Sequence, residues 1–257
     1  MIQLKSDSYQ HLTNVLPNVP FNTWFVRSVL EGHVEGKVFV DKEIEPNSMY
    51  VCHKYGMTFL WGDSNNDDFN SGLMNYFDSI KQDEWLQAYP RDWDALLGNM
   101  VKSGKLEVFS RLNFNFNQKI FEENNAQFDL NSFDIQEGTV DMMKNINGRV
   151  VPKNFWEESK LDLCKSYVAM VDNKPASIAY TSYLHDNILE MGIETAEEHR
   201  GKGLALAVCI ALIHYCIKKN LTPVWSCRLE NTGSVKLAKR LGFVETARFP
   251  YYRIISK

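Results

Sequence analysis

The fold is decided by the stretch Glu190-Met-Gly-Ile-Glu-Thr-Ala-Glu-Glu-His-Arg-Gly-Lys-Gly-Leu-Ala205, which runs from an expected strand through a basic turn into an apolar helix. The first N–H groups of a helix have no partner within the helix and lie at the positive end of its dipole, so they favour an anion. Gly201 and Gly203 let phosphate oxygens approach the backbone without meeting a Cβ atom. The stretch therefore predicts a phosphate-binding turn.

Two common phosphate motifs do not fit this turn. A dinucleotide fingerprint requires a third glycine, and that position is Leu206. The same fold places an acidic residue after the next strand, whereas residues 224–227 run into Arg228. The glycine, lysine and hydroxyl spacing of a P-loop is also absent from the sequence. The ligand is therefore expected to be a different phosphate compound.

Two ordered segments resemble a known family. Arg200-Gly-Lys-Gly-Leu-Ala205 is similar to the acyl-CoA loop of the GCN5-related N-acetyltransferases, the GNAT family, and Asn231-Thr-Gly-Ser-Val-Lys-Leu-Ala-Lys-Arg-Leu-Gly-Phe243 resembles its second signature. The second segment also makes sense by itself, because Asn231 suits a helix N-cap and Gly242 suits the left-handed residue that ends a helix. The resemblance covers residues 128–257.

The resemblance implies an α/β fold class: a GNAT-like, mostly antiparallel mixed sheet with flanking helices. It also implies direct transfer of an acetyl group from acetyl-CoA, a cosubstrate, to an amine. By position in the family motifs, acetyl-CoA is expected to contact Ile193, Thr195, Arg200, Gly201, Lys202, Gly203, Leu204, Ala205 and Asn231. The acceptor is a small amine or a peptide, and the sequence leaves open whether two copies form a homodimer.

The sequence indicates the catalytic residues less clearly than the residues expected to contact acetyl-CoA. Glu190 and Glu194 are an even number of residues apart, so they lie on one face of the expected strand, and Glu190 is favoured as general base. Many relatives have a tyrosine acid where this chain has Ala238; Ser234 is the candidate that donates to the leaving thiolate. Each residue also has a plain structural interpretation, an exposed strand carboxylate or a serine in a first helical turn. Tyr251 and Tyr252 are further candidates.

Length and composition limit the number of domains and the class of protein. The 257 residues are 44% hydrophobic and 23% charged, as in a globular protein of one large domain or two smaller ones. A net charge of −4 argues against a general nucleic-acid binder. Residues 204–217 are apolar but too few for a membrane span, and no secretory signal follows Met1. We expect a cytoplasmic protein without nucleic-acid or membrane partners.

The five cysteines form no C-x-x-C pair, so we expect buried thiols, and no histidine has metal-ligand spacing, so we expect no metal. No internal repeat is evident. Residues 1–127 are expected to form a smaller α/β domain of unknown role, with a boundary in the polar residues 113–131. An alternative to the enzyme is a non-catalytic acyl-CoA sensor or scaffold, which the missing tyrosine supports.

Overall fold

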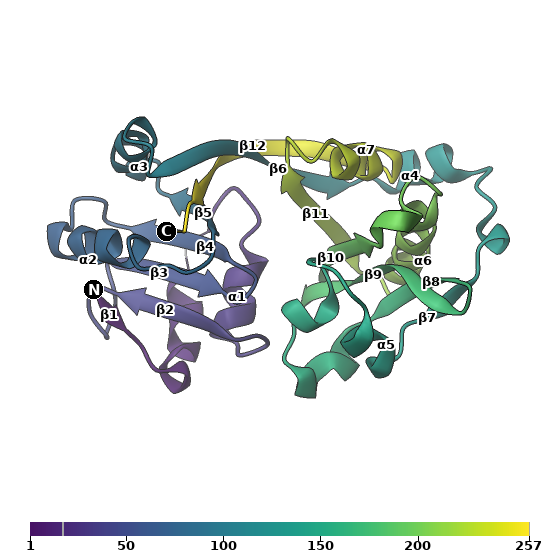
Figure 1. Cartoon of the computed structure of the whole chain (residues 1–257), viewed down its shortest axis with the longest axis horizontal. Helices are drawn as coiled ribbons and strands as arrows, with labels where there is room; N and C mark the ends of the chain where they lie inside the picture. Colours follow the sequence, from purple (N-terminus) through teal and green to yellow (C-terminus); the bar gives the residue numbers. More distant parts are fainter. Residues whose placement is uncertain (17, 257) are drawn as a thin grey trace. The chain divides into compact units, whose positions relative to one another are not determined.

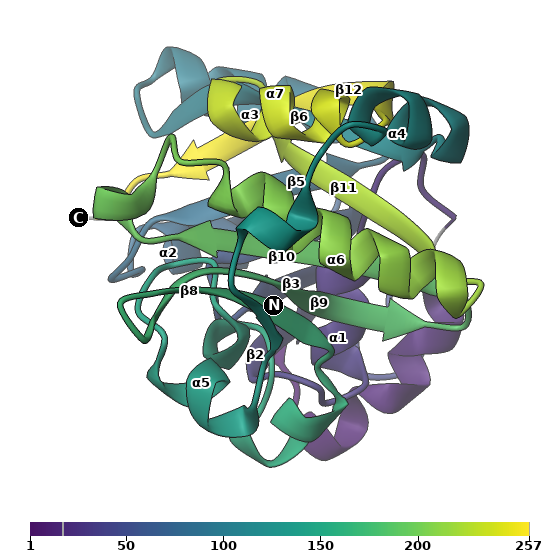
Figure 2. The same ribbon diagram turned by 90° about the vertical axis from the view of Figure 1, so that its right-hand side faces the viewer.

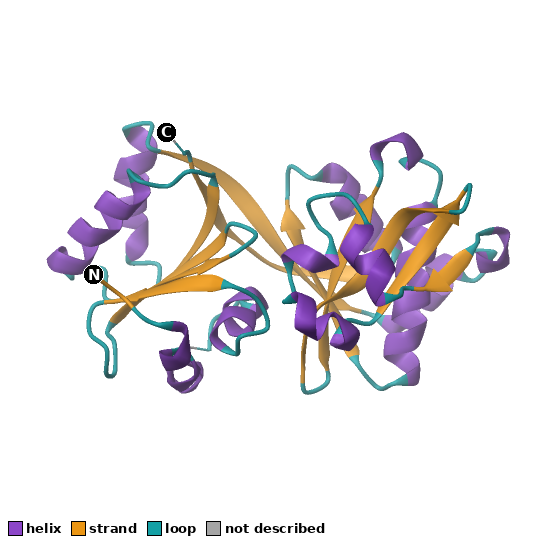
Figure 3. Cartoon of the chain, turned by 60° about the horizontal axis from the view of Figure 1, so that its bottom comes forward, coloured by secondary structure: helices purple, strands orange, loops and turns teal. Residues whose placement is uncertain are grey.

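The computed structural model describes residues 1–16 and 18–256. These residues form two compact units: unit 1 comprises residues 1–111 and 248–257, and unit 2 comprises residues 112–247. Helices and strands are labelled in Figure 1, and Figure 3 shows strands and helices in both units. The expectation of a mixed α/β fold is confirmed for the chain.

Unit 1 begins with a short strand, two 3-10 helices and a helix, followed by three antiparallel strands. Its elements are β1 (Ile2–Gln3), η1 (Ser6–Ser8), η2 (Gln10–Val15), α1 (Trp24–Leu30), β2 (Gly36–Val40), β3 (Ser48–His53), β4 (Met57–Gly62), α2 (Asp67–Phe77), β5 (Glu84–Tyr89), α3 (Trp93–Lys102) and the start of β6 (Leu106–Phe116). The strand order is β1-β2-β3-β4-β5-β12.

Unit 2 continues from β6 with the remaining helices and strands. They are α4 (Gln118–Asn125), η3 (Leu130–Ser132), β7 (Ile135–Glu137), α5 (Val140–Asn145), η4 (Pro152–Asn154), η5 (Glu158–Leu163), β8 (Ser166–Val171), β9 (Lys174–His185), β10 (Ile188–Thr195), η6 (Glu197–His199), α6 (Leu204–Lys218), β11 (Thr222–Arg228), α7 (Thr232–Arg240) and β12 (Phe243–Ile254). The strand order is β6-β11-β10-β9-β8-β7.

The two units repeat one order of elements, which the sequence did not reveal. Each has a strand, a helical segment, three antiparallel strands, a helix, a strand parallel to the last of the three, a helix and a final strand. The parallel pairs are β4 with β5 and β10 with β11. Because little sequence similarity remains, the repeat becomes visible only from the topology.

The parallel pairs differ in length between the units. In unit 1, β4 pairs with β5 over five positions, from Met57 with Trp85 to Trp61 with Tyr89. In unit 2, β10 pairs with β11 only from Ile188 with Thr222 to Glu190 with Val224. Beyond these residues β10 continues to Thr195 and β11 to Arg228, without further pairing between them among the described residues. The strands therefore open where α6 begins.

Helix α6 covers the sheet of unit 2, as Figure 2 shows. It is apolar nearly all round because it is buried: Ala207, Val208, Cys209, Leu212, Ile213 and Cys216 have no exposed surface. They pack with Leu189 and Met191 of β10 and with Trp225 of β11 in one core. Leu189, Met191 and Ile193 thus face the helix, and Glu190 and Glu194 lie on the opposite strand face.

The unit boundaries differ from the expected division after residue 127. Leu112 and Phe114 of β6 and Phe121 of α4 are buried in the core of unit 2, so the polar segment around them is part of that unit. The sequence also predicts two closing strands, residues 243–248 and 252–255, and this prediction is wrong because residues 243–254 form one strand, β12. Its end pairs with β5, and Tyr252 and Ile254 lie in the core of unit 1.

All five cysteines are buried and free of disulfides, as expected. Burial raises the pKa of the Cys216 thiol to about 12, which makes it unreactive at neutral pH. Among residues 1–16 and 18–256, no helix combines the length and apolar character needed to cross a membrane. The same residues bring together no group of three or more His, Cys, Asp or Glu side chains that could hold a metal ion.

Candidate active site

The opening between β10 and β11 exposes strand backbone to a ligand. The Ala196 N–H donates to the Ala176 carbonyl of β9 at 2.9 Å, and the Glu194 carbonyl accepts from the Ser177 hydroxyl at 3.1 Å. The Thr195 carbonyl instead accepts from Arg200 Nε at 3.3 Å. Because backbone groups alternate sides along a strand, those of Ile193 and Thr195 are directed away from β9 and toward the opening.

The turn before α6 has the geometry of an anion site. Gly201 and Gly203 have φ values of +77° and +81°, a left-handed conformation that glycine adopts without strain. A Cβ atom built on Gly201 would meet nothing within 4 Å, so this backbone faces open space. Gly203 is the N-cap of α6 and has no side chain to satisfy the first N–H groups of that helix.

The other residues of the turn and helix start are either charged and exposed, or apolar and at least partly buried. Arg200 and Lys202 are exposed, and Lys202 Nζ lies 3.3 Å from His199 Nδ1. Leu204 is buried in the core, so only its backbone is available at the helix start, and Ala205 is half-buried. Two exposed basic side chains thus lie in the turn beside the helix-start N–H groups.

The two glutamates of β10 have different surroundings. Glu190 is half-buried and is the last β10 residue that pairs with β11, so it lies where the strands begin to open. Glu194 Oε2 accepts the backbone N–H groups of Arg149 and Val150 at 3.0 and 2.9 Å, and its Oε1 lies 3.7 Å from Arg200. A carboxylate with these partners anchors the 149–150 loop.

Helix α7 brings the second pair of candidates together. Asn231 Oδ1 caps the helix by accepting the Ser234 N–H at 3.2 Å. The Ser234 hydroxyl oxygen accepts a hydrogen bond from Trp225 Nε1 of β11 at 3.1 Å. Sequence reasoning missed Trp225, which it treated only as part of a strand. The signal that could have found it is that the indole N–H of a buried tryptophan usually has a hydrogen-bond partner, and Ser234 is a nearby candidate in the sequence.

The remaining tyrosine candidates belong to unit 1. Tyr251 stacks on Trp85, with ring centroids 5.2 Å apart, and its ring also faces Arg111 at 5.0 Å. Tyr252 is buried, and its hydroxyl lies 3.5 Å from Asp94 Oδ1. Both side chains thus have partners within unit 1. Ala238, the position of the tyrosine in many relatives, has no exposed surface and packs in the core of unit 2.

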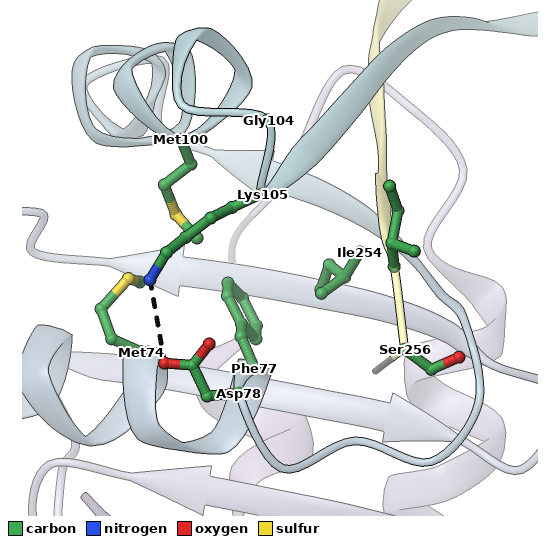
Figure 4. A pocket seen from close by; sticks show the side chains of 9 residues that line it. Met74, Phe77, Asp78, Met100, Gly104, Lys105, Ile254 and Ser256 are labelled. Atoms are coloured by element: carbon green, nitrogen blue, oxygen red, sulfur yellow. Dashed lines mark ion pairs between the residues drawn. The ribbon is translucent and has the colours of Figure 1, made fainter.

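Two pockets that are partly open to solvent do not coincide with these residues. A pocket of about 210 Å³ in unit 1 is lined by Met74, Phe77, Met100 and Ile254, together with Asp78 and Lys105, whose charged groups are 3.7 Å apart (Figure 4). A second pocket of about 390 Å³ in unit 2 lies beside α5 and Tyr215. Neither is lined by a predicted site residue, so the open strands and the turn remain the candidate site.

Comparison with known proteins agrees with this geometry. A family model described as GNAT acetyltransferase matches residues 19–252. The chain belongs to the GNAT acetyltransferase family. The match spans both units, whereas the sequence resemblance was recognised only from residue 128 onward. The "Uncharacterized N-acetyltransferase YdfB" of Bacillus subtilis (strain 168) is 26% identical over 243 residues, which are 89% of each protein.

Solved structures share the fold of this GNAT protein. A GCN5-related N-acetyltransferase-like protein from Streptococcus suis 89/1591 matches with a TM-score of 0.71 and 21% identity, covering 96% of this chain and 98% of that one. A tandem GNAT protein from the clavulanic acid biosynthesis pathway matches with a TM-score of 0.54 and 10% identity, covering 96% and 92%. At these identities the likeness concerns the fold alone.

Proposed function

We propose that this protein is an N-acetyltransferase that moves the acetyl group of acetyl-CoA directly to an amine. The observation that carries the proposal is the left-handed glycine turn at the start of α6, beside the point where β10 and β11 separate. Family membership supports acetyl transfer in general, and the turn supplies a site for the phosphates of the donor.

The residues present fit acetyl-CoA as a substrate. The turn of Arg200, Gly201, Lys202 and Gly203 would hold the pyrophosphate through backbone N–H groups and positive charge. The backbone of Ile193 and Thr195, which is directed away from β9, would bind the pantetheine amides as an added strand does. Asn231 lies on the α7 side of the opening. The thioester would then lie deeper between the strands, toward Glu190.

The chemistry then requires three contributions from the chain. Glu190, directly or through a water, would take the proton that the amine loses. A backbone N–H of β10 aimed at the thioester oxygen would stabilise the oxyanion, an effect commonly worth about 3–4 kcal/mol. Ser234 would donate a hydrogen bond to the leaving sulfur. Glu194 would position the 149–150 loop, because its carboxylate oxygens are engaged there and near Arg200.

Release of free CoA thiol tests the proposal. The protein is incubated with acetyl-CoA and a panel of small amines and peptides, and acceptor-dependent thiol is followed by a chromogenic reagent. A small-molecule or peptide acceptor that releases thiol identifies the acceptor class. The buried Ala238 in place of the family tyrosine favours one alternative, a non-catalytic acyl-CoA sensor. Tight acetyl-CoA binding without thiol release from any acceptor would support that alternative instead.

A further inference from the structure

Trp225 is held in a fixed orientation on the β11 side of the opening. It directly follows Val224, the last β11 residue that pairs with β10. Its side chain is only 3% exposed, and its ring packs on Phe243 with centroids 5.5 Å apart. From this position Nε1–H donates to Ser234 Oγ at 3.1 Å. Burial of the ring and its contact with Phe243 therefore fix the direction of the indole N–H.

This bond decides what the Ser234 hydroxyl can do. A serine hydroxyl has one proton to donate and two lone pairs, whereas an indole N–H is a donor only. The Trp225 bond uses a lone pair of Ser234, so the hydroxyl proton is directed to another acceptor. The Ser234 backbone is anchored as well, because its N–H donates to Asn231 Oδ1 at 3.2 Å. Ser234 is thus held as a hydrogen-bond donor.

We propose that Trp225 is a positioning residue that directs the Ser234 hydroxyl toward the sulfur of CoA. The proposal rests on the acetyl transfer proposed above. In that reaction the acceptor nitrogen bonds to the thioester carbon, the amine proton passes to Glu190, and the C–S bond breaks with its electron pair going to sulfur. Ser234 keeps its proton and donates a hydrogen bond to the thiolate, which takes a proton from water after it leaves.

Trp225 itself cannot activate Ser234 as a nucleophile. A serine nucleophile needs a neighbouring base, and the indole N–H cannot accept a proton. The position of the family tyrosine, Ala238, faces the core, and in this proposal the hydroxyl is supplied from the first turn of α7 instead.

Binding of CoA and of desulfo-CoA, which lacks the sulfur, tests this role without an acceptor. At pH 9 part of the thiol is ionised, and a hydrogen bond to it should make CoA bind about 3- to 10-fold more tightly than desulfo-CoA, with a smaller ratio at pH 7. In Trp225→Phe, Ser234→Ala and the double variant, calorimetry should give nearly equal affinities for CoA and desulfo-CoA at both pH values.

Trp156→Phe is the matched control. Trp156 is also 3% exposed in unit 2, but its Nε1–H donates to the Thr181 carbonyl at 2.7 Å. This variant should keep the pH-dependent ratio of the parent, although it loses a comparable buried bond. Melting temperatures of all variants check that they are folded. With an acceptor in hand, kcat should fall in each single variant at site 225 or 234, and no further in the double variant.

Three outcomes would overturn the proposal. Trp225→Phe could keep the ratio of the parent, it could change the ratio no more than Trp156→Phe does, or the effects on kcat of changing Trp225 and Ser234 could simply add. Failure of the parent to bind CoA at all would instead refute the acetyltransferase function on which the proposal rests. The two failures are therefore distinguished in one set of titrations.

Discussion

Replacing Gly201 by alanine separates the cofactor turn from the fold. Its φ is +77°, and a Cβ atom there would meet no protein atom within 4 Å. The structural cost is therefore only that of alanine in a left-handed conformation, about 1–2 kcal/mol. For a protein of this size such a loss lowers the melting temperature by about 2–8 °C. Gly201→Ala should remain folded at 25 °C.

The effect on acetyl-CoA binding should be larger. The added methyl group would occupy the open space through which a phosphate oxygen approaches the turn. Loss of one charge-assisted hydrogen bond from the backbone costs about 1.5–3 kcal/mol. This corresponds to a rise in Kd of about 10- to 150-fold. Isothermal titration of the folded variant with acetyl-CoA measures the change.

Gly32→Ala is the control that the chain itself offers. Gly32 follows α1 in unit 1, has a φ of +67°, and a Cβ atom there would also meet nothing within 4 Å. The two substitutions thus have nearly equal structural costs and differ only in site. The reasoning is refuted if Gly201→Ala binds acetyl-CoA with the affinity of the parent, or if Gly32→Ala weakens binding equally.

Three further predictions concern the base, the unit boundary and pH. Glu190→Gln should lower kcat about 100-fold or more and flatten its pH profile with little change in acetyl-CoA affinity; unchanged kcat would place the base elsewhere. A fragment of residues 128–257 should fail to show the circular dichroism of a folded domain, because it lacks the buried Leu112, Phe114 and Phe121; a cooperative melt would contradict this. Burial lowers the pKa of His53 to about 3, and its Nδ1 accepts the Tyr55 N–H at 2.9 Å. The unfolded state then binds the proton first, so this stability is present above pH 6.5 and is lost as pH falls toward 3. Urea unfolding at pH 7 and 4.5 should show the parent losing stability relative to His53→Asn, and a constant difference would speak against it.

The sequence was most informative where local chemistry decides the structure. Asp172-Asn173-Lys174-Pro175 is typical of a tight turn, and Asp172 and Asn173 have φ values of +49° and +59° in the turn between β8 and β9. The apolar run that became α6 and the capping residues Asn231 and Gly242 were also recognised. Each of these features depends on residues that are neighbours along the chain.

Features that depend on distant residues were missed. Strand β6 and helix α4 looked like a polar linker, because their apolar residues alternate with asparagine and are buried by residues distant in the sequence. The partners of Glu194 lie in the 149–150 loop, which no spacing rule connects to β10. The strand pattern therefore could not predict that Glu194 is held by this loop.

The continuity of β12 has a consequence for how the protein is made. Unit 2 is one uninterrupted segment, residues 112–247, and all of its core is available before residues 248–254 are made. Unit 1 needs this later segment, in which Tyr252, Arg253 and Ile254 pair with β5. Residues 1–111 therefore cannot complete their sheet until the chain has been translated past unit 2. In this chain the C-terminal unit is free to fold ahead of the N-terminal one.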